Sequence, residues 1–280
     1  MSKIAIIGLG LMGGSLGLAA RARGMYVAAY ARREESRRDA LAMEIVDVVF
    51  DCPEDAVKDA DMVVLCTPVL TMPKLVQGFV NNLKAGCIVT DVGSTKAFLA
   101  QEIEAVLADF SAEFIGSHPM AGSEKNGLEA SVADLYEGAR VIVTPADGTK
   151  LEKAKRVVDF WKDMGANVTE MTPQAHDEII ARTSHLPHLV AASLMACVDR
   201  GESDIVPFCG PGVRDVTRIA EGSEKIWHDI VKSNVGPILN EVHQFGEKID
   251  EIKDMLERKD FDAIKKFLAS SRDKRGNLGS

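Results

Sequence analysis

The chain has 280 residues, 46% of them hydrophobic, and a formal net charge of −9. This length suggests about two domains of ~100–200 residues each, and the negative charge argues against binding of nucleic acid. No run of ~18 or more apolar residues occurs, so we expect no membrane span. The five cysteines include no C-x-x-C pair, so we expect free thiols in a reducing cytoplasm and no metal site.

The chain opens with a predicted strand and a glycine-rich turn. Residues 3–7 form a short apolar run, and Gly8, Gly10 and Gly13 follow with G-x-G-x-x-G spacing before a helix predicted over 15–23. Such glycines allow a tight turn, close approach of a pyrophosphate, and close packing of helix and strand. The start of the helix also favours a phosphate. The predicted dinucleotide contacts are Gly8, Gly10, Leu11, Met12, Gly13, Thr67, Pro68 and Ser94.

The residues after the second predicted strand, 25–30, favour NADP over NAD. In NAD-binding folds an acidic residue commonly sits ~20 residues past the glycines and binds the ribose 2′-hydroxyl. Here Arg32 and Arg33 occupy that place, and guanidinium groups attract a 2′-phosphate. We predict NADP contacts from Arg32, Arg33 and Ser36. If both arginines are only solvated, either cofactor can bind.

Strands and helices continue to alternate up to residue 171. Continuous apolar strands are typical of a parallel sheet covered on both faces, and the alternation predicts an α/β fold with a doubly wound, mostly parallel Rossmann sheet. The further predicted strands are 46–49, 61–66, 87–91, 113–116, 140–144 and 167–171. The helices between them are predicted over 33–42, 72–82, 97–107 and 151–164.

Thr172-Pro173 marks the predicted domain boundary. We expect a dinucleotide-binding Rossmann domain over 1–172 and an all-α substrate and dimerisation domain over 173–280. Its predicted helices are 176–199, which Pro187 must kink or end, 213–220, 224–256, which Gly236-Pro237 could break, and 261–268. Residues 270–280 are expected to fray. Helices this long have apolar faces that a lone bundle leaves exposed, so we expect a homodimer through the C-terminal helices.

Two segments near the predicted sheet carry side chains suited to chemistry. Residues 91–96 follow a strand at its carboxyl end, where ligands bind in open α/β sheets, and Ser94 or Thr95 could equally cap the next helix. His118 also follows a strand, with Glu124 nearby. Its imidazole can accept a proton near neutral pH, although a lone histidine in a loop is more often structural or exposed.

The helical part contributes a third candidate segment. It combines Ser-His-Leu-Pro-His at 184–188 with Arg214 and Arg218. The two arginines are four residues apart and would share one helix face, and guanidinium groups bind carboxylates through paired hydrogen bonds. On spacing alone, a surface on which these arginines pair with neighbouring acids such as Asp215 is the simpler explanation.

Taken together, these motifs resemble those of the prephenate/arogenate dehydrogenase family of tyrosine biosynthesis, over nearly the whole chain. The residues that carry the resemblance are 8–15, 91–96, 116–122, 176–177, 184–188 and 215–220. The resemblance implies a Rossmann domain followed by a helical dimerisation domain. It also implies that prephenate or arogenate loses carbon dioxide and a hydride, which passes to NAD(P), giving 4-hydroxyphenylpyruvate or tyrosine.

The resemblance further implies roles for individual residues. His118 matches the base that accepts the proton of the ring hydroxyl. Ser94 matches a serine that contacts both this histidine and that hydroxyl. His185 and Arg218 match the groups that hold the substrate, Arg218 at a carboxylate, and Glu124 matches an acid at the pocket entrance. Trp227, Arg214 and Asp215 are further expected substrate contacts. We expect His118 and Arg218 to face one cleft beside the dinucleotide.

Three alternatives stay open at this point. Asp215 could pair with the ammonium group of arogenate or with a neighbouring arginine, so both substrates are retained. A 3-hydroxyacid dehydrogenase of the 6-phosphogluconate-dehydrogenase-like superfamily would share the glycine loop, but its lysine has no counterpart at 184–188. A non-catalytic NADP-sensing protein is the third option, although His118 and Arg218 are both present. Because the chain ends after the helices, we expect weak or absent tyrosine feedback through an appended domain.

Overall fold

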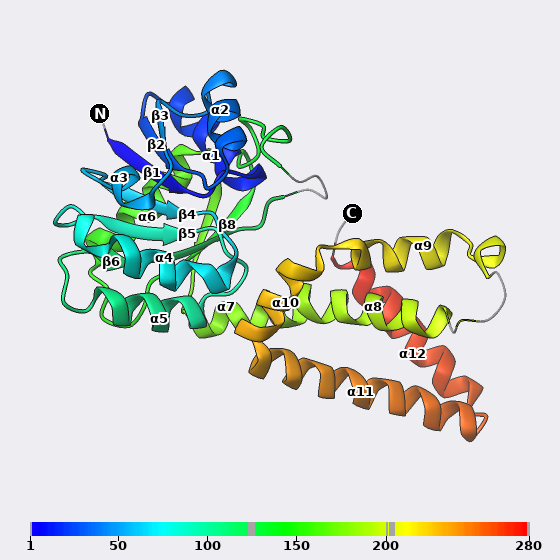
Figure 1. Ribbon diagram of the computed structural model, residues 1–280. Coiled ribbons are helices and arrows are strands. Elements are labelled where there is room, and N and C mark those ends of the chain that lie inside the picture. Colours follow the sequence, from blue (N-terminus) through cyan, green and yellow to red (C-terminus); the bar gives the residue numbers. More distant parts are fainter. Residues whose placement is uncertain (1, 123–126, 200, 202–204, 279–280) are drawn as a thin grey trace. The chain divides into compact units, whose positions relative to one another are not determined.

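The computed structural model describes residues 2–122, 127–199, 201 and 205–278 (Figure 1). Contacts along the chain divide it into two compact units, Met1–Val235 and Gly236–Ser280. The first unit holds all the strands of the described residues and the helices up to α10. The second holds most of α11 and all of α12.

A six-stranded parallel sheet forms the base of the first unit, in the order β3-β2-β1-β4-β5-β6. This is the order of a dinucleotide-binding Rossmann sheet, whose direction of winding reverses between β1 and β4. The prediction of a doubly wound parallel sheet is confirmed. The strands are β1 Lys3–Ile7, β2 Tyr26–Tyr30, β3 Val48–Phe50, β4 Met62–Leu65, β5 Ile88–Asp91 and β6 Glu113–Phe114. The helices of this part are α1 Leu11–Ala22, α2 Glu34–Ala42, α3 Pro53–Ala56, α4 Met72–Phe79 and α5 Ala97–Leu107.

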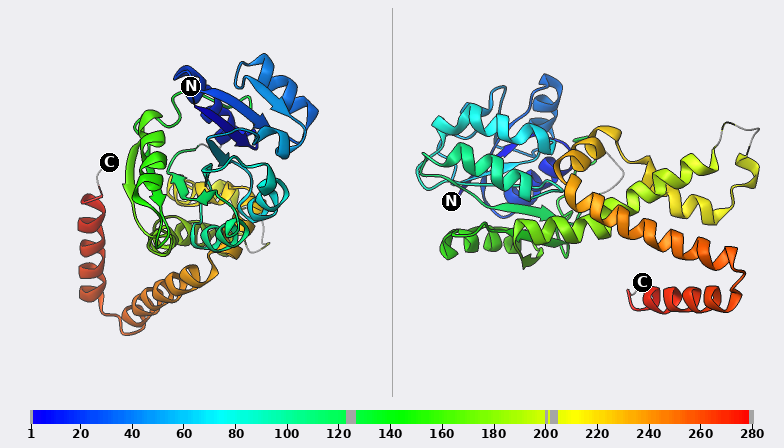
Figure 2. Two further views of the ribbon diagram at one scale, coloured as in Figure 1. Left: turned by 90° about the vertical axis from the view of Figure 1, so that its left-hand side faces the viewer. Right: turned by 90° about the horizontal axis from the view of Figure 1, so that it is seen from below.

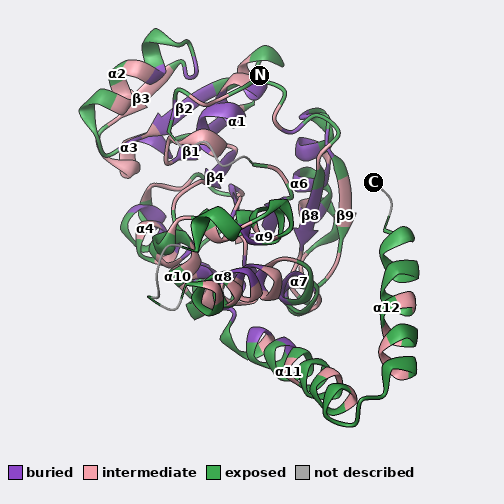
Figure 3. Ribbon diagram, turned by 90° about the vertical axis from the view of Figure 1, so that its right-hand side faces the viewer, coloured by how far each residue is buried: buried purple, intermediate pink, exposed green. Residues whose placement is uncertain are grey.

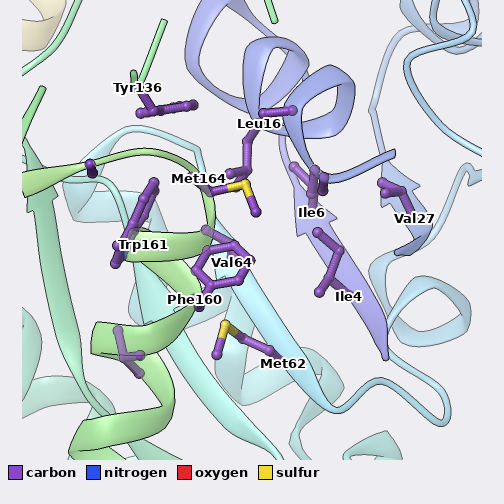
Figure 4. Close-up of a cluster of buried hydrophobic side chains, with 14 of the residues drawn as sticks. Ile4, Ile6, Leu16, Val27, Met62, Val64, Tyr136, Phe160, Trp161 and Met164 are labelled. Carbon is purple, nitrogen blue, oxygen red and sulfur yellow. The ribbon is translucent and has the colours of Figure 1, made fainter. Parts of the chain in front are cut away.

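Both faces of this sheet are buried, which is why its strands read as continuous apolar runs. In β1, Ile4 and Ile6 join one core with α1 and α6, Leu151–Asp163, while Ala5 and Ile7 join a second core with α4 and α5. Figure 4 shows the first of these cores, with Trp161 of α6 among its largest side chains.

A separate three-stranded sheet follows, in the order β7-β8-β9, where the sequence predicted a single alternating sheet. β7 is Gly116–Pro119, β8 is Arg140–Thr144 and β9 is Asn167–Glu170, and β7 runs antiparallel to β8. The predicted strand 113–116 is therefore divided at Ile115, between β6 and β7. Gly116 makes the transition possible, because a Cβ there would lie 2.5 Å from Thr144 Oγ1 and 3.1 Å from Lys96 Cδ. His118 consequently lies within a strand and not in a loop.

The helical part of the first unit begins with one long run (Figure 2). Thr172 Oγ1 accepts a hydrogen bond from Ala175 N and Pro173 occupies the first turn, so α7 begins at the predicted boundary. The run comprises α7 Pro173–Ile180, a π-helical turn Ala181–His185 and α8 Leu186–Val198. Pro187 does not end it, because the wider turn before it makes room for a ring that cannot donate a backbone hydrogen bond.

Shorter helices complete this unit. They are α9 Pro211–Thr217, a 3₁₀ turn Arg218–Glu221 and α10 Glu224–Ser233. The break expected near Gly236-Pro237 occurs at Asn234, between α10 and α11. Gly236 and Pro237 lie in the first turn of α11, where a proline costs no hydrogen bond.

The second unit is a pair of exposed helices, α11 Val235–Glu257 and α12 Phe261–Gly276 (Figure 3). α12 continues to Gly276, so the expectation that the chain frays from residue 270 was wrong. Its carboxyl end carries Lys274 and Arg275, which favour the last turn of a helix. On α11 the exposed apolar side chains follow one stripe, namely Val235, Leu239, Val242, Phe245, Ile249 and Leu256. None of the helices in the described residues combines the length and the apolar character that a membrane span needs.

Candidate active site

The glycine turn between β1 and α1 is too tight for side chains at two of its three glycines. Gly8 has φ +107°, and a Cβ there would lie 2.7 Å from Thr67 Cγ2. A Cβ at Gly13 would lie 2.1 Å from the carbonyl oxygen of Gly8. A Cβ at Gly10 would meet no heavy atom within 4 Å, so space is left beside the backbone there. Thr67 and Pro68 follow β4, and Thr67 lies next to this turn.

The amino end of α1 is suited to an anion. Gly10, the N-cap residue, makes no side-chain cap, and the first turn contains no acidic side chain. The backbone N–H groups of Leu11 and Met12 belong to this turn, where the helix dipole is positive. The open space at Gly10 and the uncapped helix together fit the diphosphate of a dinucleotide.

Three arginines gather where β2 leads into α2. Arg32 and Arg33 are exposed and Ser36 is half-buried. Arg37 Nη1 donates hydrogen bonds to the carbonyl oxygens of Ala31 and Arg32, each at 2.9 Å. Arg37 therefore shapes the turn that presents the other two, a role that sequence reasoning missed.

A fully buried ion pair connects Asp91 and Lys96, the two ends of the predicted 91–96 segment, and both residues bond to β7. Lys96 Nζ contacts Asp91 Oδ2 and donates to the carbonyl oxygen of Ser117 at 3.0 Å. Asp91 Oδ1 accepts from Ser117 N at 3.0 Å. Burial raises the pKa of Asp91 and lowers that of Lys96, while their mutual attraction acts in the opposite direction. Ser94 lies half-buried in the bend between these two residues.

His118 belongs to a buried chain of hydrogen-bonded side chains. Its Nδ1 lies 2.8 Å from Nε2 of His176, and His176 Nδ1 lies 2.8 Å from Asp177 Oδ1. Asp177 in turn accepts from the backbone N–H of Lys96 at 2.8 Å and of Ala97 at 2.9 Å. The histidine of β7 is thereby connected to α7 and to the start of α5.

Burial favours the neutral form of both histidines. It lowers the pKa of His118 well below its ordinary value of 6.5, and the neighbouring His176 and Lys96 lower it further. Burial also lowers the pKa of His176, although the hydrogen bond to Asp177 opposes this. A neutral imidazole is the form that can accept a proton.

A second histidine pair lies on the π turn and α8. His185 Nδ1 lies 3.1 Å from Asn234 Nδ2, which also donates to the carbonyl oxygen of Asp177 at 3.0 Å. Burial, the largest effect, lowers the pKa of His185 to about 4. His188 stacks on Trp227, with ring centroids 3.5 Å apart and planes at 10°. Among the described residues, His185 Nε2 and His188 Nδ1 are buried without a hydrogen-bond partner.

A pocket of about 780 Å³ opens beside this second pair. Gly222 forms part of its wall, because a Cβ there would lie 2.5 Å from Trp227 Nε1 and 3.1 Å from His188 Cε1. The polar and aromatic residues that line the pocket are Thr183, Ser184, His188, Arg218, Glu221, Ser223 and Trp227.

The predicted substrate residues take different places around this pocket. Arg218 and Trp227 line it, together with His188, to which sequence reasoning gave no separate role. His185 contacts Trp227 edge to face, with centroids 6.0 Å apart, and bonds to Asn234. Arg218 lies in the 3₁₀ turn after α9, so it does not continue the helix of Arg214.

Other predicted contacts are exposed or lie outside the described residues. Arg214 and Asp215 are exposed on α9, where Arg214 Nε donates to the carbonyl oxygen of Cys209 at 3.2 Å. Glu124 falls outside the described residues. The contact of Ser94 with His118, and a common cleft for His118 and Arg218, stay predictions. Within the described part of the chain, His, Cys, Asp and Glu form no group of three or more that could hold a metal ion.

The sheet order, the glycine turn and the uncapped α1 define a Rossmann-type dinucleotide-binding protein with a buried histidine chain. Residues 16–170 match the family model described as prephenate dehydrogenase, nucleotide-binding domain, and residues 172–270 match prephenate dehydrogenase, dimerization domain. The chain belongs to the prephenate dehydrogenase family, and the resemblance inferred from its motifs is confirmed.

Individual relatives cover almost the whole chain. A cyclohexadienyl dehydrogenase of Zymomonas mobilis is 32% identical, over 96% of this chain and 93% of its own length. A prephenate dehydrogenase of Bacillus subtilis is 33% identical, over 98% of this chain and 76% of its own. The crystal structure of prephenate dehydrogenase from A. aeolicus, in complex with hydroxyphenyl propionate and NAD+, is similar with a TM-score of 0.93 and 31% identity. That similarity covers 99% of this chain and 98% of the other.

Proposed function

We propose that the protein catalyses the oxidative decarboxylation of prephenate or arogenate, giving 4-hydroxyphenylpyruvate or tyrosine. The observation that carries this proposal is the buried His118, whose pKa is lowered by burial, in a chain of the prephenate dehydrogenase family. Such a histidine is poised to remove the proton of a ring hydroxyl. Aromatisation of the ring then supplies most of the driving force.

Different residues of the chain have different roles in this reaction. A bound nicotinamide supplies the hydride acceptor. His118 accepts the hydroxyl proton as the ring carbon–hydrogen bond breaks, and Ser94 contacts the same hydroxyl. As carbon dioxide leaves, the electrons of the broken bond enter the aromatic ring, so the enzyme's main tasks are positioning and proton removal.

The pocket of Arg218 is proposed to hold the substrate. Its guanidinium can bind a carboxylate through two hydrogen bonds, and the stacked His188–Trp227 pair supplies a flat apolar wall. His185 Nε2, which is buried without a partner among the described residues, is a further group that the substrate can satisfy. Asp215, Arg214 and Glu124 stay in the proposed set as outer contacts.

NADP is proposed as the preferred cofactor. The exposed Arg32 and Arg33 follow β2, and Rossmann proteins commonly bind the cofactor ribose just after this strand. The first acids, Glu34 and Glu35, come only in the first turn of α2. If this is right, substituting both arginines by alanine raises KM for NADP at least ~tenfold and leaves KM for NAD nearly unchanged. Equal effects on the two cofactors would contradict the preference.

A homodimer through the C-terminal helices is proposed from the matched dimerisation domain and the exposed stripe of α11. Phe245→Glu would place a charge in the middle of that stripe. We expect the substitution to convert the sedimenting species from dimer to monomer at micromolar concentration, whereas Glu247→Gln, on the same helix, leaves the dimer intact.

One assay tests the activity itself. Prephenate and arogenate are each mixed with the enzyme and with NAD or NADP, and formation of the reduced nicotinamide is followed by absorbance. Turnover of at least one of the two cyclohexadienyl acids is expected. Turnover of a simple 3-hydroxyacid alone would favour a 3-hydroxyacid dehydrogenase, and cofactor binding without any turnover would favour a sensor protein.

A further inference from the structure

The buried chain that begins at His118 ends on a carboxylate whose hydrogen-bonding role is fixed. Asp177 Oδ1 accepts from Lys96 N and its Oδ2 accepts from Ala97 N, at the amino end of α5. Two backbone N–H donors and a helix amino terminus stabilise the ionised form of a carboxylate. An ionised carboxylate only accepts hydrogen bonds. At its contact with His176, Asp177 is therefore the acceptor.

This fixed end determines the position of each proton along the chain. Because Asp177 Oδ1 accepts at 2.8 Å, His176 Nδ1 must carry the hydrogen. A neutral imidazole has only one N–H, so His176 Nε2 offers a lone pair. His118 Nδ1, 2.8 Å from that lone pair, must then be the donor. The remaining ring nitrogen of His118, Nε2, is left as the acceptor.

We propose that His176 and Asp177 are positioning residues that hold His118 in the tautomer with the proton on Nδ1, so that Nε2 is the base of the reaction. This inference rests on the proposed function, in which His118 removes the hydroxyl proton. When Nε2 of His118 takes up that proton, the hydrogen bond from His118 Nδ1 to His176 is retained. The hydrogen bonds between His118, His176 and Asp177 therefore need no rearrangement. His176 is fully buried and Asp177 is 2% exposed, so water does not compete for these contacts.

The tautomer is measured directly by nitrogen NMR on the protein labelled with ¹⁵N at its six histidines, with the His118 signals assigned from H118N. The proposal predicts Nδ1 protonated and Nε2 unprotonated in the wild-type protein at neutral pH, without substrate. A wild-type His118 protonated on Nε2 would overturn it. This readout does not depend on turnover. If the tautomer is as expected but neither cyclohexadienyl acid reacts, the proposed function fails and the tautomer assignment stands.

Two substitutions at His176 distinguish the effect of its hydrogen-bond acceptor from the effect of its size. H176F keeps a ring but offers no acceptor to His118 Nδ1, so we expect kcat to fall roughly 10²–10⁴-fold, the usual contribution of a general base. KM for the substrate and Kd for the cofactor should change by less than about threefold. H176Q places an amide oxygen near the lost Nε2 and should recover at least ~tenfold of kcat. Near-normal kcat in H176F, or no recovery in H176Q, would contradict the proposal.

T172A is the matched structural control. It removes the N-cap of α7, the helix that carries both His176 and Asp177, but touches no member of the hydrogen-bonded chain. We expect a lower melting temperature and a kcat within about twofold of wild type. A large loss of kcat in T172A would mean that the stability of α7 alone explains the effects of the His176 substitutions.

Discussion

At the scale of single residues, the fold buries four histidines and so favours their neutral form. His118, His176, His185 and His188 are all buried, and burial is the first cause of the lowered pKa of each. Removing an imidazolium from water costs more than removing the neutral ring. The interior therefore supplies bases that stay unprotonated below the pH at which an exposed histidine becomes charged.

The first prediction concerns His118→Asn. We expect kcat to fall roughly 10²–10⁴-fold, because only the proton acceptor is lost, while cofactor affinity, measured by quenching of protein fluorescence, is unchanged. Arg218→Ala serves as the comparison, since it should chiefly raise KM for the substrate. A His118→Asn enzyme with near-normal turnover would show that another group is the base.

The second prediction concerns the dependence of activity on pH. His118 must be neutral to act, and its pKa is lowered well below 6.5. Activity should therefore persist as the pH falls through 6.5 and decline only at lower pH. The measurement is kcat/KM for the substrate over the acidic range. A decline centred at 6.5 or above would indicate a base with the pKa of an exposed histidine.

At the scale of elements, two glycines of the turn between β1 and α1 have different roles: one is required for packing, and the other leaves space for the cofactor. Gly13 is required for packing, because its Cβ would overlap the carbonyl oxygen of Gly8. Gly10 has φ −136°, which any residue can adopt, and its Cβ would meet nothing in the protein. The two positions therefore make a matched pair.

The third prediction compares Gly10→Ala with Gly13→Ala. Gly10→Ala should keep the melting temperature of the wild type but weaken cofactor binding at least ~tenfold, because its methyl group occupies the space left for the diphosphate. Gly13→Ala should lower the melting temperature, since backbone must shift to relieve the overlap. Calorimetry and cofactor titration check both. Tight cofactor binding by Gly10→Ala would place the diphosphate elsewhere.

At the scale of the whole molecule, the same buried histidines make stability depend on pH. His185 has a pKa of about 4 in the folded protein, against an ordinary value of 6.5 when unfolded. Below pH 6.5 His185 becomes protonated in the unfolded chain but stays neutral in the folded protein. Its contribution to the free energy of unfolding is therefore fully present above pH 6.5 and is lost as the pH falls toward about 4. This single group accounts for about 2–3 kcal/mol between about pH 7 and pH 4.5.

The fourth prediction follows from that linkage. His185→Asn keeps a side chain that can bond to Asn234 but does not titrate. Its free energy of unfolding, measured by urea denaturation, should fall between about pH 7 and pH 4.5 by about 2–3 kcal/mol less than that of the wild type. Carboxylates titrate alike in both proteins and cancel from the comparison. Equal pH dependence would show that His185 is not the group responsible.

The sequence by itself determined what depends on neighbouring residues. The glycine spacing, the continuous apolar strands and Thr172-Pro173 act within a few positions. α5 and β8 have the predicted bounds, whereas α7 begins at Pro173, three residues before the predicted helix start at 176. α3, a single turn of four residues, was not predicted, because it is too short to show a helical period.

Only the tertiary structure decided which polar groups meet. Asp177 bonds to backbone groups 80 and 81 residues away, and His176 bonds to His118 58 residues away. His118, predicted to lie in a loop, belongs to β7 of a second sheet that no local sequence pattern indicated. The tertiary structure also brings His188 beside Trp227. Local rules fix φ, ψ and the period of burial, whereas the pairing of buried donors and acceptors depends on how the finished layers pack.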